Sequence, residues 1–213
     1  MKILGLLLPR VVMISMAVSQ VRPDHNPSAS HPQTYGDSDA YDVYSAAIPM
    51  DNWYWENSKT LLILQEIPPA EWSIGSPKGA LQGDAEFRKA FAGVFGSFDE
   101  ANQQKMLLEH RFTFQKPYRL VSKDELDAAF RNVPQNAIRD GWEGFRGSFP
   151  NSSGYLILSG VGFNADKTIA VVYVEHRCGN MCSQAQYYIL KRVDGQWVKC
   201  VPKGLKTEMR GES

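Results

Sequence analysis

The C-terminal part of the chain contains four short runs rich in β-branched and aromatic residues, and this pattern constrains the fold more than any other feature. The runs cover residues 155–162, 168–177, 184–192 and 196–201. Turn-forming residues separate them, and Asp194-Gly195 is the strongest turn signal, because its positive φ values suit a two-residue hairpin. The sequence therefore predicts a four-stranded antiparallel meander.

A two-residue turn at 194–195 also fixes the register of the last hairpin. Arg192 then faces Trp197, and Ile189 faces Cys200 across the two strands. Cys200 lies on the same side as Ile189, in apolar surroundings. We therefore expect it to be a buried free thiol.

The first 19 residues have the pattern of a signal peptide. After a basic start they are almost entirely apolar, and Ala17 and Ser19 occupy the small-residue positions of a cleavage site. Pro9 and Arg10 divide the stretch into pieces shorter than the ~20 apolar residues that a spanning helix needs. The sequence therefore predicts a secreted or periplasmic protein with no membrane insertion after cleavage.

Export determines how the three cysteines are interpreted, because disulfides persist in oxidising compartments. Cys178 and Cys182 are four residues apart, with Gly179 and Asn180 between them able to form a tight loop. The hairpin brings the ends of this loop within the distance that a disulfide spans. We expect this pair to be bonded and Cys200 to be left over, although the odd count leaves the pairing open.

Composition indicates one folded domain flanked by two polar segments. The chain has 213 residues, of which 43% are hydrophobic, and this is enough for one buried core. Residues 20–36 are rich in Pro, Ser, His and Asn and predict a flexible linker. A single domain is expected over residues 37–205, followed by a polar tail at 206–213.

Hydrophobic periodicity and capping residues predict several helices before the meander. Asp39 is expected to be the N-cap of the first helix, and Gly96 is expected to end the second. Ser97 and Ser122 each precede a glutamate by three residues, which is the capping-box pattern of a helix start. The expected helices cover residues 39–48, 84–95, 97–108 and 122–130, with a weaker helical segment at 138–145.

Two further strands are expected outside the meander. Residues 60–66 form a short apolar run before two prolines, and residues 112–120 alternate as in a half-buried strand. Residues 72–83 are rich in Gly, Ser and Pro and predict a loop. The expected fold class is α+β, with helices packed on an antiparallel sheet.

The C-terminal strands carry S-x-V-G-F-N-x-D at 159–166, A-x-V-Y-V at 170–174, C-G-x-x-C at 178–182 and Y-Y-x-L from Tyr187. In these motifs the chain resembles a group of uncharacterised exported bacterial proteins. It departs from that group where Ser183 replaces a glycine after the second cysteine. The resemblance implies export and a shared C-terminal fold. It brings no activity, because the group has no known function.

Known catalytic motifs are not found in the sequence. It lacks a G-x-S-x-G elbow, an H-E-x-x-H helix and a phosphate loop, and we expect no cofactor. Equal numbers of basic and acidic residues, 23 each, give no field that favours nucleic acid. The carboxylates that could form an acid–base pair are expected on solvated faces. They are Glu66, Glu71, Glu109 and Glu175.

Metal binding is the weaker interpretation of two further patterns. His176 lies beside the two cysteines near residue 180, but a structural zinc site usually shows two ligand pairs, so a disulfide with no metal is expected. Asp37, Asp39 and Asp42 lack the glycine and terminal glutamate of a calcium loop, and helix capping explains them better.

Aromatic residues give the candidate binding site. Trp53 and Trp55 would share one side of an extended segment, where they could stack against a sugar or a peptide, with His176 as a further candidate. The alternative is that these rings pack in the core. The leading hypothesis is an exported, non-enzymatic domain that binds an envelope component, a sugar or a peptide. The competing hypothesis is a hydrolase or other enzyme whose groups converge only in the fold, with His110 or His176 tested first.

Overall fold

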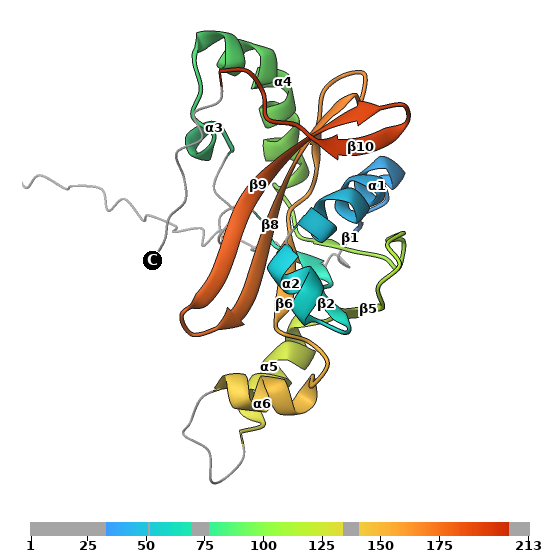
Figure 1. The fold of residues 1–213 in the computed structure, drawn as a ribbon, viewed down its shortest axis with the longest axis vertical. Coiled ribbons are helices and arrows are strands. Elements are labelled where there is room, and N and C mark those ends of the chain that lie inside the picture. Colours follow the sequence, from blue (N-terminus) through green and yellow to red (C-terminus); the bar gives the residue numbers. More distant parts are fainter. Residues whose placement is uncertain (1–32, 51, 70–76, 134–140, 205–213) are drawn as a thin grey trace, which may run out of the picture. The chain divides into compact units, whose positions relative to one another are not determined.

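The computed structural model describes residues 33–50, 52–69, 77–133 and 141–204 (Figure 1). The segments expected to be the signal peptide and the polar tail lie outside the described residues. The same holds for most of the predicted linker, for Glu71 and for Ile138. None of the helices in the described part of the chain has the length and apolarity required to cross a membrane.

A seven-stranded sheet forms the centre of the described fold, in the order β10-β9-β8-β6-β2-β5, with β7 pairing beside β8. Its strands are β2 (Leu61–Leu64), β5 (Tyr118–Val121), β6 (Tyr155–Leu158), β7 (Gly162–Phe163), β8 (Ile169–Gly179), β9 (Cys182–Val193) and β10 (Gln196–Lys199). The α+β class and the C-terminal meander are confirmed. In the other half of the sheet, β2 runs parallel to β5 and β6, which the sequence did not predict.

A small second sheet orders residues that were expected to belong to the linker. It contains β1 (Gln33–Thr34), β4 (Met106–Leu107) and β3 (Glu66–Ile67), in the order β1-β4-β3. The next residue after β1, Tyr35, is buried, and its hydroxyl accepts a hydrogen bond from the Val161 amide at 2.8 Å. This contact with a distant part of the chain explains why residues 33–35 are ordered despite their polar neighbours.

Three of the helices begin at acidic or serine caps. The helices are α1 (Ser38–Ala47), η1 (Ile48–Met50), α2 (Asn52–Asn57), α3 (Pro77–Ala80), α4 (Ala85–Ala101), α5 (Lys123–Arg131) and α6 (Gly141–Ser148). Ser122 caps α5 as expected, and Asp84, the first residue of the expected second helix, caps α4. The cap of α1 is Asp37 and not Asp39, because the Asp37 carboxylate accepts the Asp39 amide. One helical turn, α3, lies within the segment predicted as a loop.

The region from 84 to 120 differs most from the sequence expectation. Helix α4 continues through Gly96, because Phe98 extends its apolar stripe and is fully buried. Ser97 does not cap a new helix, and its hydroxyl accepts the Phe163 amide at 3.1 Å instead. Strand β4 occupies the end of the helix expected at 97–108. The strand expected at 112–120 is limited to β5, at 118–121.

Strand alternation divides the core between the two faces of the large sheet. Leu61 and Ile63 of β2 and Leu158 of β6 pack in one continuous cluster with α1 and α2. We call this the filled face. Leu62 and Ile157, at the intervening positions, point to the opposite face, whose buried residues form two separate clusters. We call this the split face.

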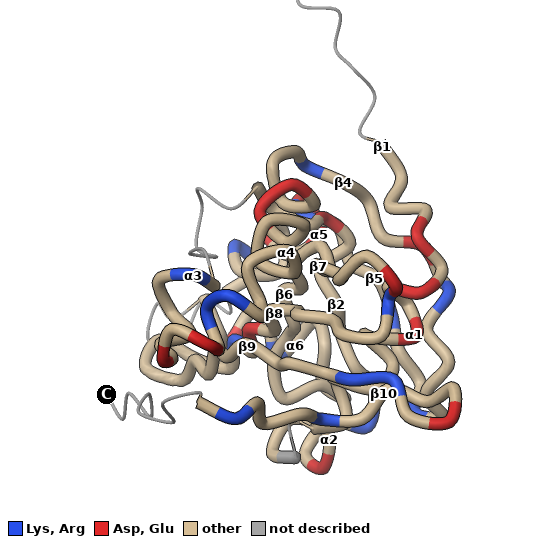
Figure 2. Tube along the Cα trace, turned by 90° about the horizontal axis from the view of Figure 1, so that it is seen from above, with Lys and Arg blue, Asp and Glu red and all other residues tan. Residues whose placement is uncertain are grey.

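The two clusters of the split face have different helical covers. Helices α5 and α6 cover β2, β5 and β6, whereas α4 covers β8 and β9. Figure 1 shows α4 and the α5–α6 pair at opposite ends of the view. Figure 2 shows basic and acidic residues interspersed around the described elements, in agreement with the balanced charge.

Candidate functional site

The split face carries a row of polar side chains on β8. Alternate residues of a strand point to one face, so Tyr173, Glu175 and Arg177 follow one another along it. Tyr173 belongs to the cluster beneath α4. The row runs from there toward the part of the sheet that α5 covers, where Arg177 lines a groove. It therefore lies at the border between the two helical covers.

Glu175 is the centre of this polar row. Its side chain is 8% exposed, and its carboxylate accepts hydrogen bonds from Arg177 Nε at 2.5 Å and from the Tyr173 hydroxyl at 3.4 Å. A third, longer contact of 3.5 Å comes from the Ser183 hydroxyl on β9. The expectation that Glu175 lies on a solvated face is therefore wrong. A buried carboxylate is costly unless it is paired, and these donors supply the pairing.

A groove adjoins the polar row where β6 meets α5, and we call it the β6–α5 groove. Its volume is about 260 Å³. Its apolar lining comes from Leu64, Pro68, Leu126, Phe130 and Ile157, together with the ring of Tyr155. Its charged lining residues are Glu66, Lys123, Asp127 and Arg177.

The charged groups of the β6–α5 groove are paired with one another or with neighbours. Lys123 binds Asp127 at 2.6 Å, and Glu66 binds Lys105 at 2.6 Å. Arg177 is held by Glu175 as described above. The groove therefore combines an apolar interior with charges that cancel, and it has no excess of either sign to select an ionic ligand.

Burial and pairing shift two pKa values at this groove. Burial is the largest effect on Tyr155 and raises the pKa of its hydroxyl. The pKa of Arg177 is raised overall. Burial alone would lower it, but the interactions of the guanidinium with Glu175 and Tyr155 outweigh burial. Near neutral pH the groove therefore presents a neutral phenol and a charged guanidinium, both able to donate hydrogen bonds.

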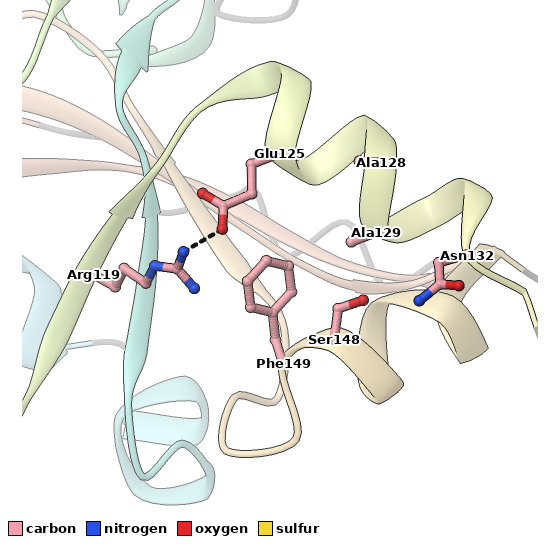
Figure 3. A pocket seen from close by; sticks show the side chains of 7 residues that line it. All are labelled: Arg119, Glu125, Ala128, Ala129, Asn132, Ser148 and Phe149. Atoms are coloured by element: carbon pink, nitrogen blue, oxygen red, sulfur yellow. Dashed lines mark hydrogen bonds and ion pairs between the residues drawn. The ribbon is translucent and has the colours of Figure 1, made fainter.

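A second groove lies on the other side of α5, and we call it the Arg119 groove (Figure 3). It consists of two hollows of about 390 and 160 Å³ that share Arg119, Ser148 and Phe149. Figure 3 shows Arg119 reaching from β5 toward Glu125 on α5, with the Phe149 ring beside them. Arg119 and Glu125 form an ion pair, and the guanidinium carbon is 5.7 Å from the Phe149 ring centroid. Polar side chains make up a larger share of the lining of this groove than of the first.

The three candidate binding residues from the sequence lie on the filled face and do not form one platform. Residues 53–55 are helical in α2, so Trp53 and Trp55 point in different directions. Trp53 is 50% exposed, and its ring centroid lies 5.3 Å from that of buried His176. Trp55 instead contacts Phe114 edge-on at 5.7 Å. The prediction that residues 53–55 are extended is therefore wrong. Tyr54, between the two tryptophans, is buried in the core, and its ring centroid lies 4.3 Å from that of His176.

The two histidines proposed for catalysis are also separate from the grooves. His110 is exposed and stacks on Tyr118 at 5.5 Å, whereas His176 lies beneath α2. Neither histidine lines the β6–α5 groove or the Arg119 groove. The described residues contain no group of three or more His, Cys, Asp or Glu side chains that could hold a metal ion.

The predicted disulfide is confirmed. Cys178 and Cys182 are bonded, with their Cα atoms 5.0 Å apart, at the tip of the β8–β9 hairpin. Cys200 is a free thiol as expected, but it is half-buried and not buried, and it packs beside the cluster under α4. The predicted register of the last hairpin is confirmed as well, since Arg192 pairs with Trp197 and the Cys200 amide donates to the Ile189 carbonyl at 2.8 Å.

No protein family, curated protein or solved structure matches this chain.

Sequence reasoning missed the residues of the β6–α5 groove. One signal was available: Glu175 and Arg177 interrupt an apolar strand at alternate positions, where a buried face would otherwise continue. The other groove residues come from β2, β6 and α5 and from β3 with the proline that follows it. The parallel pairing and packing that bring these elements together leave no local trace in the sequence.

Proposed function

We propose that this protein is an exported binding domain that accepts an apolar side chain of a peptide or protein partner in the β6–α5 groove. The observation that carries the proposal is the combination of an apolar groove with the ion pair between half-exposed Arg177 and buried Glu175 at its border. Ligand sites in proteins are typically apolar hollows with a few placed polar groups. Groups with shifted pKa values, here Tyr155 and Arg177, also concentrate at functional sites.

The size of the groove favours one side chain rather than a larger ligand. Its volume of about 260 Å³ is below the ~300 to 1,000 Å³ typical of pockets for small molecules. An aliphatic or aromatic side chain that enters it would contact Leu64, Phe130 and Ile157. Full burial of such a side chain contributes roughly 1.5 to 3 kcal/mol.

The border of the groove can hold the backbone of the same peptide. A guanidinium has five N–H donors, and the Nε of Arg177 uses one of them on Glu175. Glu175 fixes the orientation of Arg177, and donors of Arg177 directed to the groove can reach a peptide carbonyl. The paired charges at the border suit a neutral backbone better than a free ion.

Export rests on two supports. The first is the signal-peptide pattern of residues 1–19, and the second is the Cys178–Cys182 disulfide, which persists in an oxidising compartment. The test is cell fractionation followed by N-terminal sequencing of the recovered protein. We expect a mature chain outside the cytoplasm that begins near residue 20. An uncleaved chain in the cytoplasm with both thiols reduced would contradict export.

Binding is tested with short peptides and NMR. Acetylated, amidated tripeptides with a central Leu, Phe or Trp are titrated into the labelled protein, with a central Ser as the control peptide. We expect the amide signals of β6 and α5 to shift with the apolar peptides and not with the Ser peptide. Equal shifts with all four peptides, or no shifts at all, would count against the proposal.

A matched pair of variants locates the site. Arg177→Lys keeps the charge near Glu175 but removes the planar fork of donors, so we expect several-fold weaker peptide binding. Arg119→Lys makes the same change in the Arg119 groove, where Arg119 pairs with Glu125, and should leave binding unchanged. The reverse result would move the site to the Arg119 groove.

A further inference from the structure

One edge of β9 is open along half of its length. Residues 182–191 of β9 pair with β8, whereas β10 covers only residues 190–193 of β9. The last contact on that side is the bond from the Cys200 amide to the Ile189 carbonyl. From residue 182 to residue 188, this edge meets no other strand in the described part of the chain (Figure 1).

Strand geometry determines which backbone groups point out from this edge. The bond to Cys200 shows that the backbone groups of Ile189 face the β10 side. Backbone groups of an antiparallel strand alternate in direction, so those of Ala185 and Ser183 face the same side, and those of Gln184 face β8. Within the described residues, the outward amide and carbonyl groups of Ala185 have no hydrogen-bond partner.

The open edge lacks the features that usually prevent strands from pairing with other chains. Such edges typically carry Lys, Pro or a bulge. Residues 182–190 contain no charged residue and no proline, and the irregularity at the hairpin tip lies on β8, between Arg177 and Gly179. In contrast, the outer strand β10 carries exposed Lys199, and Pro117 precedes the other outer strand, β5.

We propose that the open edge of β9 pairs with the same edge of a second copy of this chain, antiparallel and about a two-fold axis at Ala185. A two-fold axis makes one surface complementary to itself, because each outward donor meets an acceptor of the other copy. The uncharged stretch brings no like charges together, and the chain has a formal net charge of zero. Ala185 lies midway along the open stretch, and its methyl group lets the two strands approach.

The oligomeric state tests this pairing. Light scattering after size-exclusion chromatography should give the mass of two chains at high protein concentration. Ala185→Pro removes an outward amide and leaves the amides that bond to β8, so we expect the mass of one chain.

Two control variants test whether the loss depends on the Ala185 amide. Ala185→Ser keeps the amide and should remain dimeric. Lys199→Pro alters an outward amide on β10 and should also remain dimeric. A wild-type chain that is monomeric at every concentration, or a dimeric Ala185→Pro variant, would overturn the proposal.

Cross-linking tests the register. At a hydrogen-bonded pair the Cα atoms are about 5.5 Å apart, within the range that a disulfide spans. In a Cys200→Ser background, Ala185→Cys should therefore form a covalent dimer under mild oxidation with glutathione disulfide. Ser183→Cys should not, because its counterpart in the second copy would lie four residues away along the strand. Cross-linking of both variants to the same extent would contradict an axis at Ala185.

Discussion

The two faces of the large sheet use alternate residues of the same strands but differ in how they are packed. On the filled face, apolar side chains form one continuous cluster under α1 and α2, and buried tyrosine hydroxyls are hydrogen-bonded. The Tyr44 hydroxyl, for example, donates to the Ser159 carbonyl at 2.6 Å. On the split face, polar side chains of β8 lie between two clusters, and a groove borders them.

This difference indicates that substitutions on the filled face should cost more stability, and it agrees with our proposal that a partner binds on the split face. A continuous, close-packed cluster cannot accept a new group without strain. A border between two helical covers can, because the packing there is already interrupted.

A matched pair of leucines gives the largest expected difference. Leu158 of β6 is fully buried in the filled face, whereas Leu64 of β2 is half-buried and lines the β6–α5 groove. Leu158→Ala should lower the free energy of unfolding by about 2 to 5 kcal/mol, because it leaves a cavity. Leu64→Ala should cost about 1 kcal/mol or less, because the groove already exposes this side chain. Urea unfolding measures both, and equal costs would contradict the difference between the faces.

Alkaline pH tests how well the filled face excludes water. Burial raises the pKa of Tyr35 to about 12 from its usual value near 10. The folded state therefore binds the phenolic proton more tightly, and this stability is complete below pH 10 and is lost as the pH rises toward 12. We expect the titration of the Tyr35 hydroxyl alone to lower the free energy of unfolding by about 2 kcal/mol between pH 10 and pH 12.

Tyr35→Phe is the variant for this measurement. It removes the titrating hydroxyl, so the drop in unfolding free energy between pH 10 and pH 12 should be smaller than in the wild type. It also leaves the Val161 amide without its acceptor, so the whole curve should lie lower. An unchanged pH dependence would mean that Tyr35 reaches solvent in the folded protein.

Removing the disulfide, which lies at the end of the polar row, should have a smaller effect on the free energy of unfolding. Cys178 and Cys182 close a short loop, and loop-closure entropy predicts a stabilisation of about 2 kcal/mol or less. Replacing both cysteines with serine should lower the free energy of unfolding by up to that amount in urea. The amide signals of Arg177 should shift more than those of Leu158, because only Arg177 lies next to the loop. A loss of several times that size would mean that the tip also supports the sheet.

The sequence predicts the C-terminal half of the sheet well because its information is local. The turn at 194–195 sets the register, and the spacing of two cysteines predicts their bond. The parallel pairing of β2 with β5 and β6 joins residues far apart in the chain, and no short motif encodes it. The groove depends on that pairing. For the same reason, sequence analysis assigned the binding role to Trp53 and Trp55, which are prominent in the sequence but lie on the filled face.

The smallest expected effect comes from the outer rim of the filled face. Trp53 is 50% exposed, whereas Trp197 is 7% exposed and belongs to the cluster under α1. Trp53→Phe should change the free energy of unfolding by less than about 0.5 kcal/mol, as is usual for surface substitutions. It should also lower the fraction of tryptophan fluorescence that iodide quenches, because iodide reaches exposed rings such as that of Trp53.

Trp197→Phe provides the matched control and a sharper test of the comparison. It should leave the iodide-quenched fraction nearly unchanged, because the ring of Trp197 is shielded. Its cost in stability should be modest, because the buried indole N–H has no hydrogen-bond partner among the described residues and its loss offsets part of the lost packing. If Trp53→Phe proves the more destabilising of the two, then α2 contributes to the core through Trp53, and the filled face extends further outward than its buried cluster indicates.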